Sequence, residues 1–227
     1  MKKKIVVIHS GGMDSSLCLR LMMQDFLPGE ITSLSFIYGQ RHETSEIKAA
    51  RKICLDWQID HVEIPISFLS QITQSALLNK EEKISQQDTG IPNTMVLGRN
   101  GLMARLGAIY GYGVGANKIC MGIIGVEAAN SGYRDCTRGY MDLMQEVLRL
   151  DLDDPSFSII TPIVDLTKKQ TLQIAQKLGV LEYLLEETVT CYEGIAKQGC
   201  GVCPACMLRN EGIEEYRREI GPIHISY

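Results

Sequence analysis

One stretch near the start of the chain constrains its fold more than any other: a short apolar run that breaks into a turn rich in serine and glycine. The run Ile5-Val6-Val7-Ile8 is β-branched throughout and predicts a buried strand. Beyond the turn, apolar residues recur at helical spacing, at Leu17, Leu21 and Met22. A turn from a strand into a helix collects unpaired N–H groups and the positive end of the helix dipole, so it favours an anion.

The turn reads Ser10-Gly11-Gly12-Met13-Asp14-Ser15-Ser16. It has neither the Gly-Lys-Ser/Thr ending of a Walker A loop nor the spacing Gly-x-Gly-x-x-Gly. A plain strand-to-helix turn with a serine cap is the alternative. The Ser-Gly-Gly-x-Asp-Ser pattern resembles the loop of the N-type ATP pyrophosphatase (PP-loop) superfamily, which implies that ATP binds here and is split into AMP and pyrophosphate. The resemblance assigns to ATP the residues His9, Ser10, Gly11, Gly12, Met13, Asp14, Ser15, Ser16, Leu17, Cys18 and Leu19.

Composition favours a cytoplasmic protein that acts on a small molecule. The chain has 227 residues, a net charge of −4 and a hydrophobic content of 45%, which suits one α/β domain with a small appendage. The acidic balance argues against extended contacts with nucleic acid. No apolar run reaches about 18 residues, and the first residues lack a signal-peptide core, so we expect neither a membrane span nor secretion.

The eight cysteines fall into two groups, and all are expected to be reduced thiols. Four are scattered and predict core or pocket lining: Cys18, Cys54, Cys120 and Cys136. The others follow the spacing Cys191-x8-Cys200-x2-Cys203-x2-Cys206 and offer four soft ligands, which favours structural zinc. An iron–sulfur cluster is the alternative, although the residues after Cys206 lack the cysteine and proline typical of ferredoxins.

Strands and helices alternate along the chain, which predicts a parallel sheet with helices on both faces. The expected strands span residues 5–8, 31–38, 61–66, 118–124 and 159–162, and further helices are expected near residues 47–57, 99–110, 141–148 and 168–178. Between residues 67 and 94 the periodicity fades, and a lid-like insertion is expected. We therefore predict a Rossmann-like α/β domain of the adenine nucleotide alpha hydrolase type over residues 1–185 and a zinc-binding segment with four cysteine ligands over residues 186–227.

Further motifs narrow the resemblance. They are Tyr38-Gly39-Gln40-Arg41-His42, Gly98-Arg99-Asn100, a Gly-Ile-Pro-Asn-Thr run at 90–94, and Thr190-Cys191-Tyr192 with the cysteines that follow. Together with the turn they resemble the 7-cyano-7-deazaguanine synthase (QueC) family over nearly the whole chain. The resemblance implies ATP-dependent conversion of 7-carboxy-7-deazaguanine and ammonia into the 7-cyano compound, a precursor of queuosine and archaeosine, through an adenylated carboxylate and an amide. It also implies Mg²⁺ beside ATP, and a homodimer is expected.

The same resemblance gives three residues catalytic roles. Asp14 is assigned to Mg²⁺ or to orienting the phosphate-binding hydroxyls, with helix capping as the alternative. Arg99 and Lys168 are assigned to neutralising pyrophosphate or the developing charge, with solvated cations at helix ends as the alternative.

Substrate contacts are expected at Gln40, Arg41, Glu127, Tyr133 and Asp135. A guanidinium such as that of Arg41 matches a carboxylate, Tyr133 can stack on the deazaguanine, and Asp135 can accept from its guanidine-like edge. A core tyrosine and a turn aspartate are the alternatives for the last two. The remaining histidines His42, His61 and His224 show no spacing typical of metal ligands or general bases.

Two segments depart from the family pattern and alter the expected substrate pocket. Arg134 replaces the proline expected before Asp135, and the residues before Gly98 lack an expected proline. Two other functions therefore stay open: a paralogue of the same fold that transfers a deazaguanine-type carboxylate to another amine, and a tRNA thiolation enzyme, although neither a basic patch nor an RNA-binding domain is visible. A non-enzymatic zinc-knuckle binder would leave the phosphate turn without a role.

Overall fold

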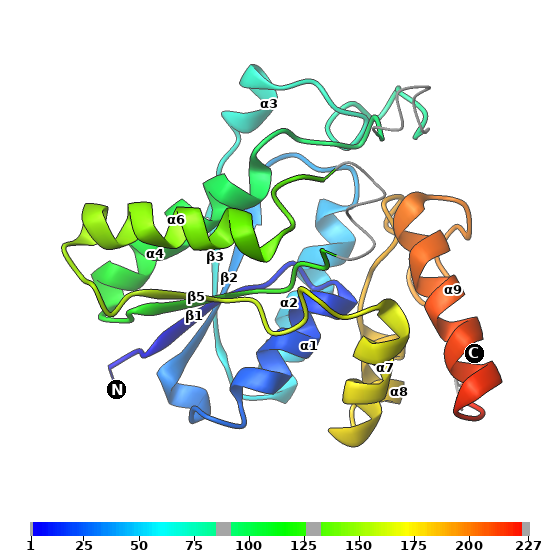
Figure 1. Cartoon of the computed structure of the whole chain (residues 1–227). Helices are drawn as coiled ribbons and strands as arrows, with labels where there is room; N and C mark the ends of the chain where they lie inside the picture. The colour runs from blue at the N-terminus through cyan, green and yellow to red at the C-terminus, as the bar shows by residue number, and fades with distance from the viewer. Residues whose placement is uncertain (1, 85–91, 126–132, 224–227) are drawn as a thin grey trace.

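A computed structural model describes residues 2–84, 92–125 and 133–223 (Figure 1). Within these residues, five parallel strands form one sheet in the order β3-β2-β1-β4-β5. The strands are β1 (Ile5–Ile8), β2 (Ile31–Ile37), β3 (Asp60–Pro65), β4 (Lys118–Met121) and β5 (Ser158–Ile160). After β3 the chain crosses to the other side of β1, so the strand order reverses there, at the kind of position where open α/β sheets bind ligands.

β1 lies at the centre of the sheet and is covered on both faces. Val6 pairs with Thr32 of β2 on one side and with Ile119 of β4 on the other. Successive side chains alternate between two apolar cores, since Val7 belongs to one core and Val6 to the other. This double burial explains why the apolar run of β1 is continuous.

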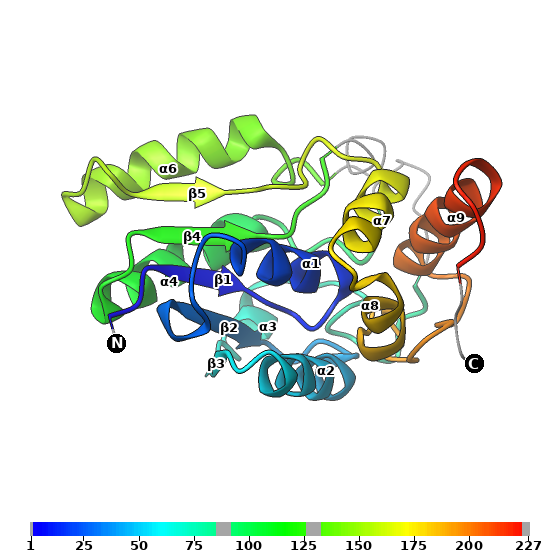
Figure 2. The ribbon, with the colours of Figure 1, turned by 90° about the horizontal axis from the view of Figure 1, so that it is seen from below.

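Helices cover both faces of the sheet (Figures 1 and 2). α1 (Met13–Met22) and α2 (Glu43–Asp56) pack on one face, and α4 (Arg99–Val114) and α6 (Arg138–Leu152) pack on the other. Two shorter elements flank the strands: the 3-10 helix η1 (Pro28–Glu30) leads into β2, and α3 (Leu69–Ile72) follows β3.

Three helices after β5 form a group beside α1 (Figure 2): α7 (Lys168–Lys177), α8 (Leu181–Glu187) and α9 (Pro204–Glu219). Leu172, Leu184 and Ile213, one from each helix, belong to the core that also contains residues of α1. Thr167 starts α7 with a capping box, because its hydroxyl accepts from the Gln170 N–H while the Gln170 side chain accepts from the Thr167 N–H.

The predicted Rossmann-like α/β fold is confirmed, with differences in single elements. β4 ends at Met121 rather than at residue 124, because Gly122 passes close to the phosphate turn, where a Cβ would lie 2.6 Å from Ser15 N. The sequence patterns do not predict α8 or α9.

Of the lid-like insertion, residues 67–84 and 92–94 are described, and the rest lies outside the described residues. Among the described helices, none is long and apolar enough to cross a membrane.

Candidate functional site

The serine- and glycine-rich turn joins β1 to α1, and its hydroxyls bind the backbone of the turn itself. The Ser16 hydroxyl donates to Gly12 O at 2.8 Å, and Ser10 N–H donates to Ser15 Oγ at 3.2 Å. Gly11 has a φ of 83°, and a Cβ at this position would lie 2.2 Å from Glu46 O of α2. Only glycine therefore lets the turn close against α2.

A cavity of about 280 Å³ lies over the turn. Its walls come from the ends of β1, β2 and β4, from the first turns of α1 and α4, and from the segment that follows α8. Six of the residues predicted to bind ATP line it: His9, Ser10, Gly12, Met13, Asp14 and Ser15. The other five lie outside the lining: Gly11, Ser16, Leu17, Cys18 and Leu19. Of these, Leu17, Cys18 and Leu19 belong to the core, so they support the turn from beneath.

Asp14 and Lys168 form an ion pair at the edge of this cavity. The Lys168 Nζ lies 2.6 and 2.7 Å from the two carboxylate oxygens of Asp14. The Lys168 side chain is only 4% exposed, so the alternative of a solvated cation is wrong for this residue. The pair holds a carboxylate at the cavity wall and a buried cation directly behind it.

Arg99 starts α4 and lies among tyrosines. Its Nη1 donates to the Tyr38 hydroxyl at 3.2 Å, and the Tyr38 phenol raises the pKa of Arg99 further above its ordinary value. Burial raises the pKa of Tyr38 and of Tyr192, so both phenols stay neutral. Tyr133 also lines the cavity, and its hydroxyl lies 2.9 Å from Thr94 Oγ1. A fixed cation among neutral phenols suits a ligand that is both anionic and planar.

Gln40 lines the cavity, but its side-chain amide is already hydrogen-bonded to other residues of the protein. Gln40 Oε1 accepts from Tyr38 N–H at 3.0 Å, and its Nε2 donates to Glu46 at 3.3 Å. His42 Nε2 lies 3.4 Å from the same carboxylate, and the His42 ring lies 5.6 Å from that of Tyr192. These contacts join the turn after β2 to α2 and to the segment after α8.

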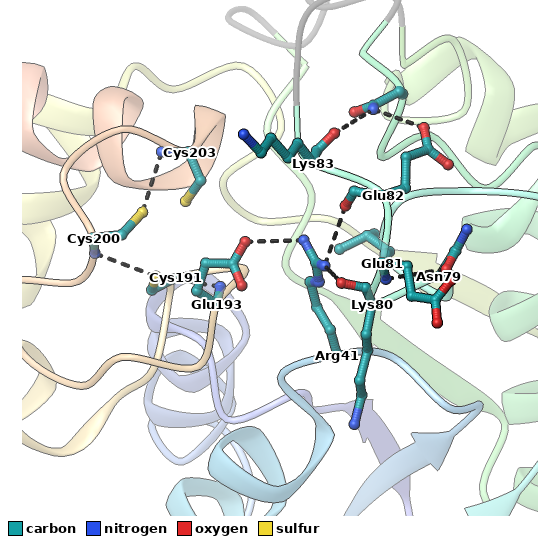
Figure 3. A network of polar contacts seen from close by, with 12 residues as sticks. Arg41, Asn79, Lys80, Glu81, Glu82, Lys83, Cys191, Glu193, Cys200 and Cys203 are labelled. Atoms are coloured by element: carbon teal, nitrogen blue, oxygen red, sulfur yellow. Dashed lines mark hydrogen bonds and ion pairs between the residues drawn. The ribbon is translucent and has the colours of Figure 1, made fainter.

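Arg41 is not among the residues that line the cavity. It joins the insertion to the cysteine segment (Figure 3). Its Nη1 lies 2.9 Å from Glu193 Oε1, and its Nη2 donates to Lys80 O at 2.7 Å and to Glu82 O at 3.2 Å. The side chain of Arg41 is only 7% exposed. The structure therefore does not bring Arg41 together with Gln40 at the cavity, and its substrate role stays a prediction.

Asp135 is buried beside the cavity, at the start of α4. Its Oδ2 accepts from Asn100 N–H at 2.9 Å, which stabilises the end of the helix that carries Arg99. Arg134, the residue in place of the expected proline, is exposed. Glu127 lies outside the described residues, as does His224.

The four clustered cysteines come together as predicted. The ligand atoms of Cys191, Cys200, Cys203 and Cys206 all lie within 4.8 Å of one another, so the cluster can hold a metal ion. Backbone N–H groups stabilise thiolates here, since Cys200 N–H donates to Cys191 Sγ and Cys203 N–H to Cys200 Sγ, both at 3.3 Å. Burial raises the pKa of Cys200, but hydrogen bonds from the N–H groups of Val202 and Cys203 and from the side chains of Cys191 and Cys203 together lower it to about 7.

Sequence reasoning gave no site role to several residues that line the cavity, among them Tyr38, Glu46, Met103 and Tyr192. A signal was present for the two tyrosines, because each stands within a motif that carries the family resemblance. Glu46 and Met103 lie within helices, where the apolar periodicity predicts no ligand contact.

The parallel sheet, the serine- and glycine-rich turn at its switch point and the cavity above that turn define a Rossmann-like α/β protein with a turn suited to an anion. Comparison with protein families narrows this class to one family. Residues 4–217 match the family described as "Queuosine biosynthesis protein QueC". The chain belongs to this family.

Two curated relatives support the assignment over nearly their whole length. Both are named 7-cyano-7-deazaguanine synthase and come from two strains of Staphylococcus epidermidis. Each is 40% identical to this chain over 220 residues, which is 97% of this chain and 96% of the relative.

Two solved structures share the fold at much lower identity. The U34-tRNA thiolase NcsA from Methanococcus maripaludis, with its iron–sulfur cluster, is 14% identical with a TM-score of 0.52, covering 96% of this chain and 67% of the thiolase. A 4-thiouridine synthetase in complex with RNA and ATP is 12% identical with a TM-score of 0.54, covering 95% of this chain and 52% of the synthetase. At this identity the likeness supports the fold alone.

Proposed function

We propose that this chain is an ATP-dependent ligase that converts 7-carboxy-7-deazaguanine and ammonia into 7-cyano-7-deazaguanine, a precursor of queuosine. The observation that carries the proposal is 40% identity, over 97% of the chain, to curated synthases of that name. The Ser-Gly-Gly-x-Asp-Ser turn under a cavity lined by Arg99 and three tyrosines is consistent with that reaction.

The reaction needs the same activation twice. A carboxylate on an electron-rich ring is a poor electrophile, so one of its oxygens first attacks the α-phosphate of ATP and releases pyrophosphate. Ammonia then displaces AMP and leaves an amide. The amide oxygen attacks a second ATP in the same way, and loss of AMP and protons gives the nitrile. One nucleotide site serves both halves, because in each half a substrate oxygen is transferred to the α-phosphorus of an ATP molecule.

The described residues divide this work between charge and position. The turn from Ser10 to Ser16 holds the phosphates, with Asp14 assigned to Mg²⁺ or to orienting the hydroxyls. Lys168 and Arg99 offset negative charge that gathers on the phosphates. Tyr133 stacks on the deazaguanine ring. Gln40, Arg41, Glu127 and Asp135 are further proposed substrate residues, of which Gln40 alone lines the cavity among the described residues.

We assign zinc to the cysteine cluster and Mg²⁺ to ATP. Four sulfur ligands within 4.8 Å of one another suit tetrahedral zinc and leave no position for a reacting water, so this ion is structural. The segment from residue 186 would then be held by the metal, on a Rossmann-like domain that ends near residue 185. A homodimer and a cytoplasmic location complete the proposal.

Mass spectrometry of the products tests the function directly. The protein is incubated with ATP, Mg²⁺, ammonium and 7-carboxy-7-deazaguanine, and we expect the 7-cyano product. Asp14→Ala is the control, and it should abolish turnover while its circular dichroism matches the parent, because α1 keeps its backbone and its apolar face. Amide that accumulates without nitrile, while an added amine or protein becomes acylated, would instead assign the chain to a paralogue that uses another acceptor.

A further inference from the structure

A second cluster of metal-ligating side chains lies beneath the phosphate turn, away from the four clustered cysteines. His9 follows β1, Cys54 comes from α2 and His61 from β3, and their ligand atoms lie within 4.8 Å of one another. His9 is fully buried and Cys54 is 2% exposed. The proposed reaction assigns no role to Cys54 or His61.

The distances in this cluster match the edges of a metal tetrahedron. Cys54 Sγ lies 3.7 Å from Nδ1 of His9 and 3.7 Å from Nδ1 of His61. With Zn–S of about 2.3 Å and Zn–N of about 2.0 Å, a tetrahedral angle gives a sulfur-to-nitrogen edge of about 3.5 Å. The hydroxyl of Ser33 on β2 lies 2.9 and 3.0 Å from the same two nitrogens, so it can provide the fourth ligand.

The outer nitrogen of the His9 imidazole has the kind of hydrogen-bonded partner that metal-bound histidines use. His9 Nε2 lies 2.9 Å from the Ser16 hydroxyl, and this hydroxyl donates to Gly12 O. Such an outer contact fixes the ring orientation of His9 and leaves its Nδ1 free to ligate. His61 Nε2 makes no hydrogen bond to any described residue and lies 3.4 Å from the Glu63 carboxylate, which Arg51 holds at 2.6 and 2.7 Å. The Nδ1 atoms of both rings lie 3.7 Å from Cys54 Sγ.

The three side chains can supply one thiolate and two neutral imidazoles to a cation. The Cys54 thiol would lose its proton to solvent as the ion binds, and the thiolate would offset one positive charge in the core.

We propose that His9, Cys54 and His61, with Ser33, form a second metal site for a thiophilic d10 ion, either Zn²⁺ or Cu⁺. The thiolate and imidazole donors are the ligands that such ions prefer. Because His9 and Cys54 are buried, refolding in the presence of the ion gives it access to all three ligands. The proposal is independent of the synthase activity, since it concerns metal content alone.

Refolding with a defined metal tests the site. The full chain is unfolded with a chelator, refolded with Zn²⁺ or, in a separate anaerobic series, with Cu⁺, desalted, and analysed for metal per chain by plasma mass spectrometry. We expect Cys54→Ala to bind one ion fewer than the parent in the series that uses the preferred metal. Cys18→Ala, which removes a buried thiol from α1, is the matched control and should bind as many ions as the parent.

The spectroscopic signature separates this site from the cysteine cluster. With ¹¹³Cd in place of zinc, the parent should give a downfield resonance for four sulfurs and a second one upfield for mixed nitrogen and sulfur ligands. Cys54→Ala should lose the second resonance, and His61→Asn should lose it as well if Cys54→Ala fails to refold. Equal metal content in the parent and both variants, in both series, would overturn the proposal and leave the cluster as a hydrogen-bonded chain.

Discussion

The pair of Asp14 and Lys168 joins the phosphate turn to a residue 154 positions away in the sequence. Burial and the capping box of α7 hold Lys168 in place, so its charge is fixed before ATP arrives. A fixed charge costs no reorganisation during the reaction, and it gains in strength where water is excluded. Under the proposed function, Lys168 therefore stabilises the charge that gathers on the phosphates.

We expect Lys168→Met to lower kcat/KM for nitrile formation by about 10²- to 10³-fold, because the change removes one such preorganised charge. Methionine keeps an unbranched apolar chain in the buried position. Lys169→Met is the matched control, since Lys169 is the next residue and pairs instead with Glu219 at 2.7 Å near the surface. Steady-state kinetics of both variants test this role. An equal loss of kcat/KM in Lys168→Met and Lys169→Met would contradict it.

For single residues, the sequence predicted contacts between residues close in the chain better than contacts between residues far apart in it. The turn from Ser10 to Ser16 is continuous, so its chemistry can be inferred from one stretch. Lys168 entered only through the family resemblance. The arrangement of His9, Cys54 and His61 could not be predicted, because spacing in the sequence says nothing of ligands that come from a strand end, a helix and another strand.

Among the elements, α9 couples the cysteine segment to the proposed active site. It starts at Pro204, directly after Cys203, and it packs against α7 at Gly212. A Cβ on Gly212 would lie 2.5 and 2.6 Å from Cγ and Cβ of Lys168. The stem of Lys168 thus lies against the helix that follows Cys203 and carries Cys206.

Gly212→Ala tests this contact. We expect it to destabilise the fold by about 1–3 kcal/mol, because α9 must move away from α7, and to lower kcat through displacement of Lys168. Gly113→Ala is the control: Gly113 also lies in a helix, but no atom lies within 4 Å of its added Cβ, so a gain of up to about 1 kcal/mol is expected. Guanidinium unfolding and kinetics measure both effects, and equal stability of the two variants would argue against tight packing at Gly212.

Removal of the metal from the cysteine cluster should act through the same element. We expect Cys203→Ser to lower the melting temperature and solubility more than it changes the KM for ATP, because structural zinc contributes on the order of 10–16 kcal/mol of apparent binding free energy. Cys136→Ser, at a half-buried thiol outside the cluster, provides the comparison. If the purified protein contained iron and sulfide, the four cysteines would be assigned to an iron–sulfur cluster instead of zinc.

The elements themselves were predictable where local signals agreed. β1 shows a continuous β-branched run, and α7 combines a capping box with a glycine after its end, so both were predicted within a residue or two. α9 was missed because its first turn contains the cysteine spacing, which indicates a metal knuckle before it indicates a helix. β4 was predicted too long because its last apolar residues leave the sheet to pass the phosphate turn.

In the whole molecule, the cavity is built where segments far apart in sequence converge. The turn after β1, the start of α4 and the segment after α8 all border it, and Arg41 links that last segment to the insertion (Figure 3). The parallel sheet makes this convergence possible, because all of its strands end at the same edge. Changes in the segments around the cavity can therefore alter the substrate while the turn and the sheet stay unchanged.

The fate of the carboxylate oxygens follows from this single site. If each half of the reaction attacks the α-phosphate, both oxygens of 7-carboxy-7-deazaguanine leave in AMP, one in each of two molecules. With the carboxylate labelled by ¹⁸O, we expect two AMP and two pyrophosphate per nitrile, with one label in each AMP and none in pyrophosphate. Mass spectrometry and ³¹P NMR of the nucleotides measure this. Label in inorganic phosphate together with ADP would place the attack on the γ-phosphate, and the Ser-Gly-Gly-x-Asp-Ser turn would then hold a different leaving group.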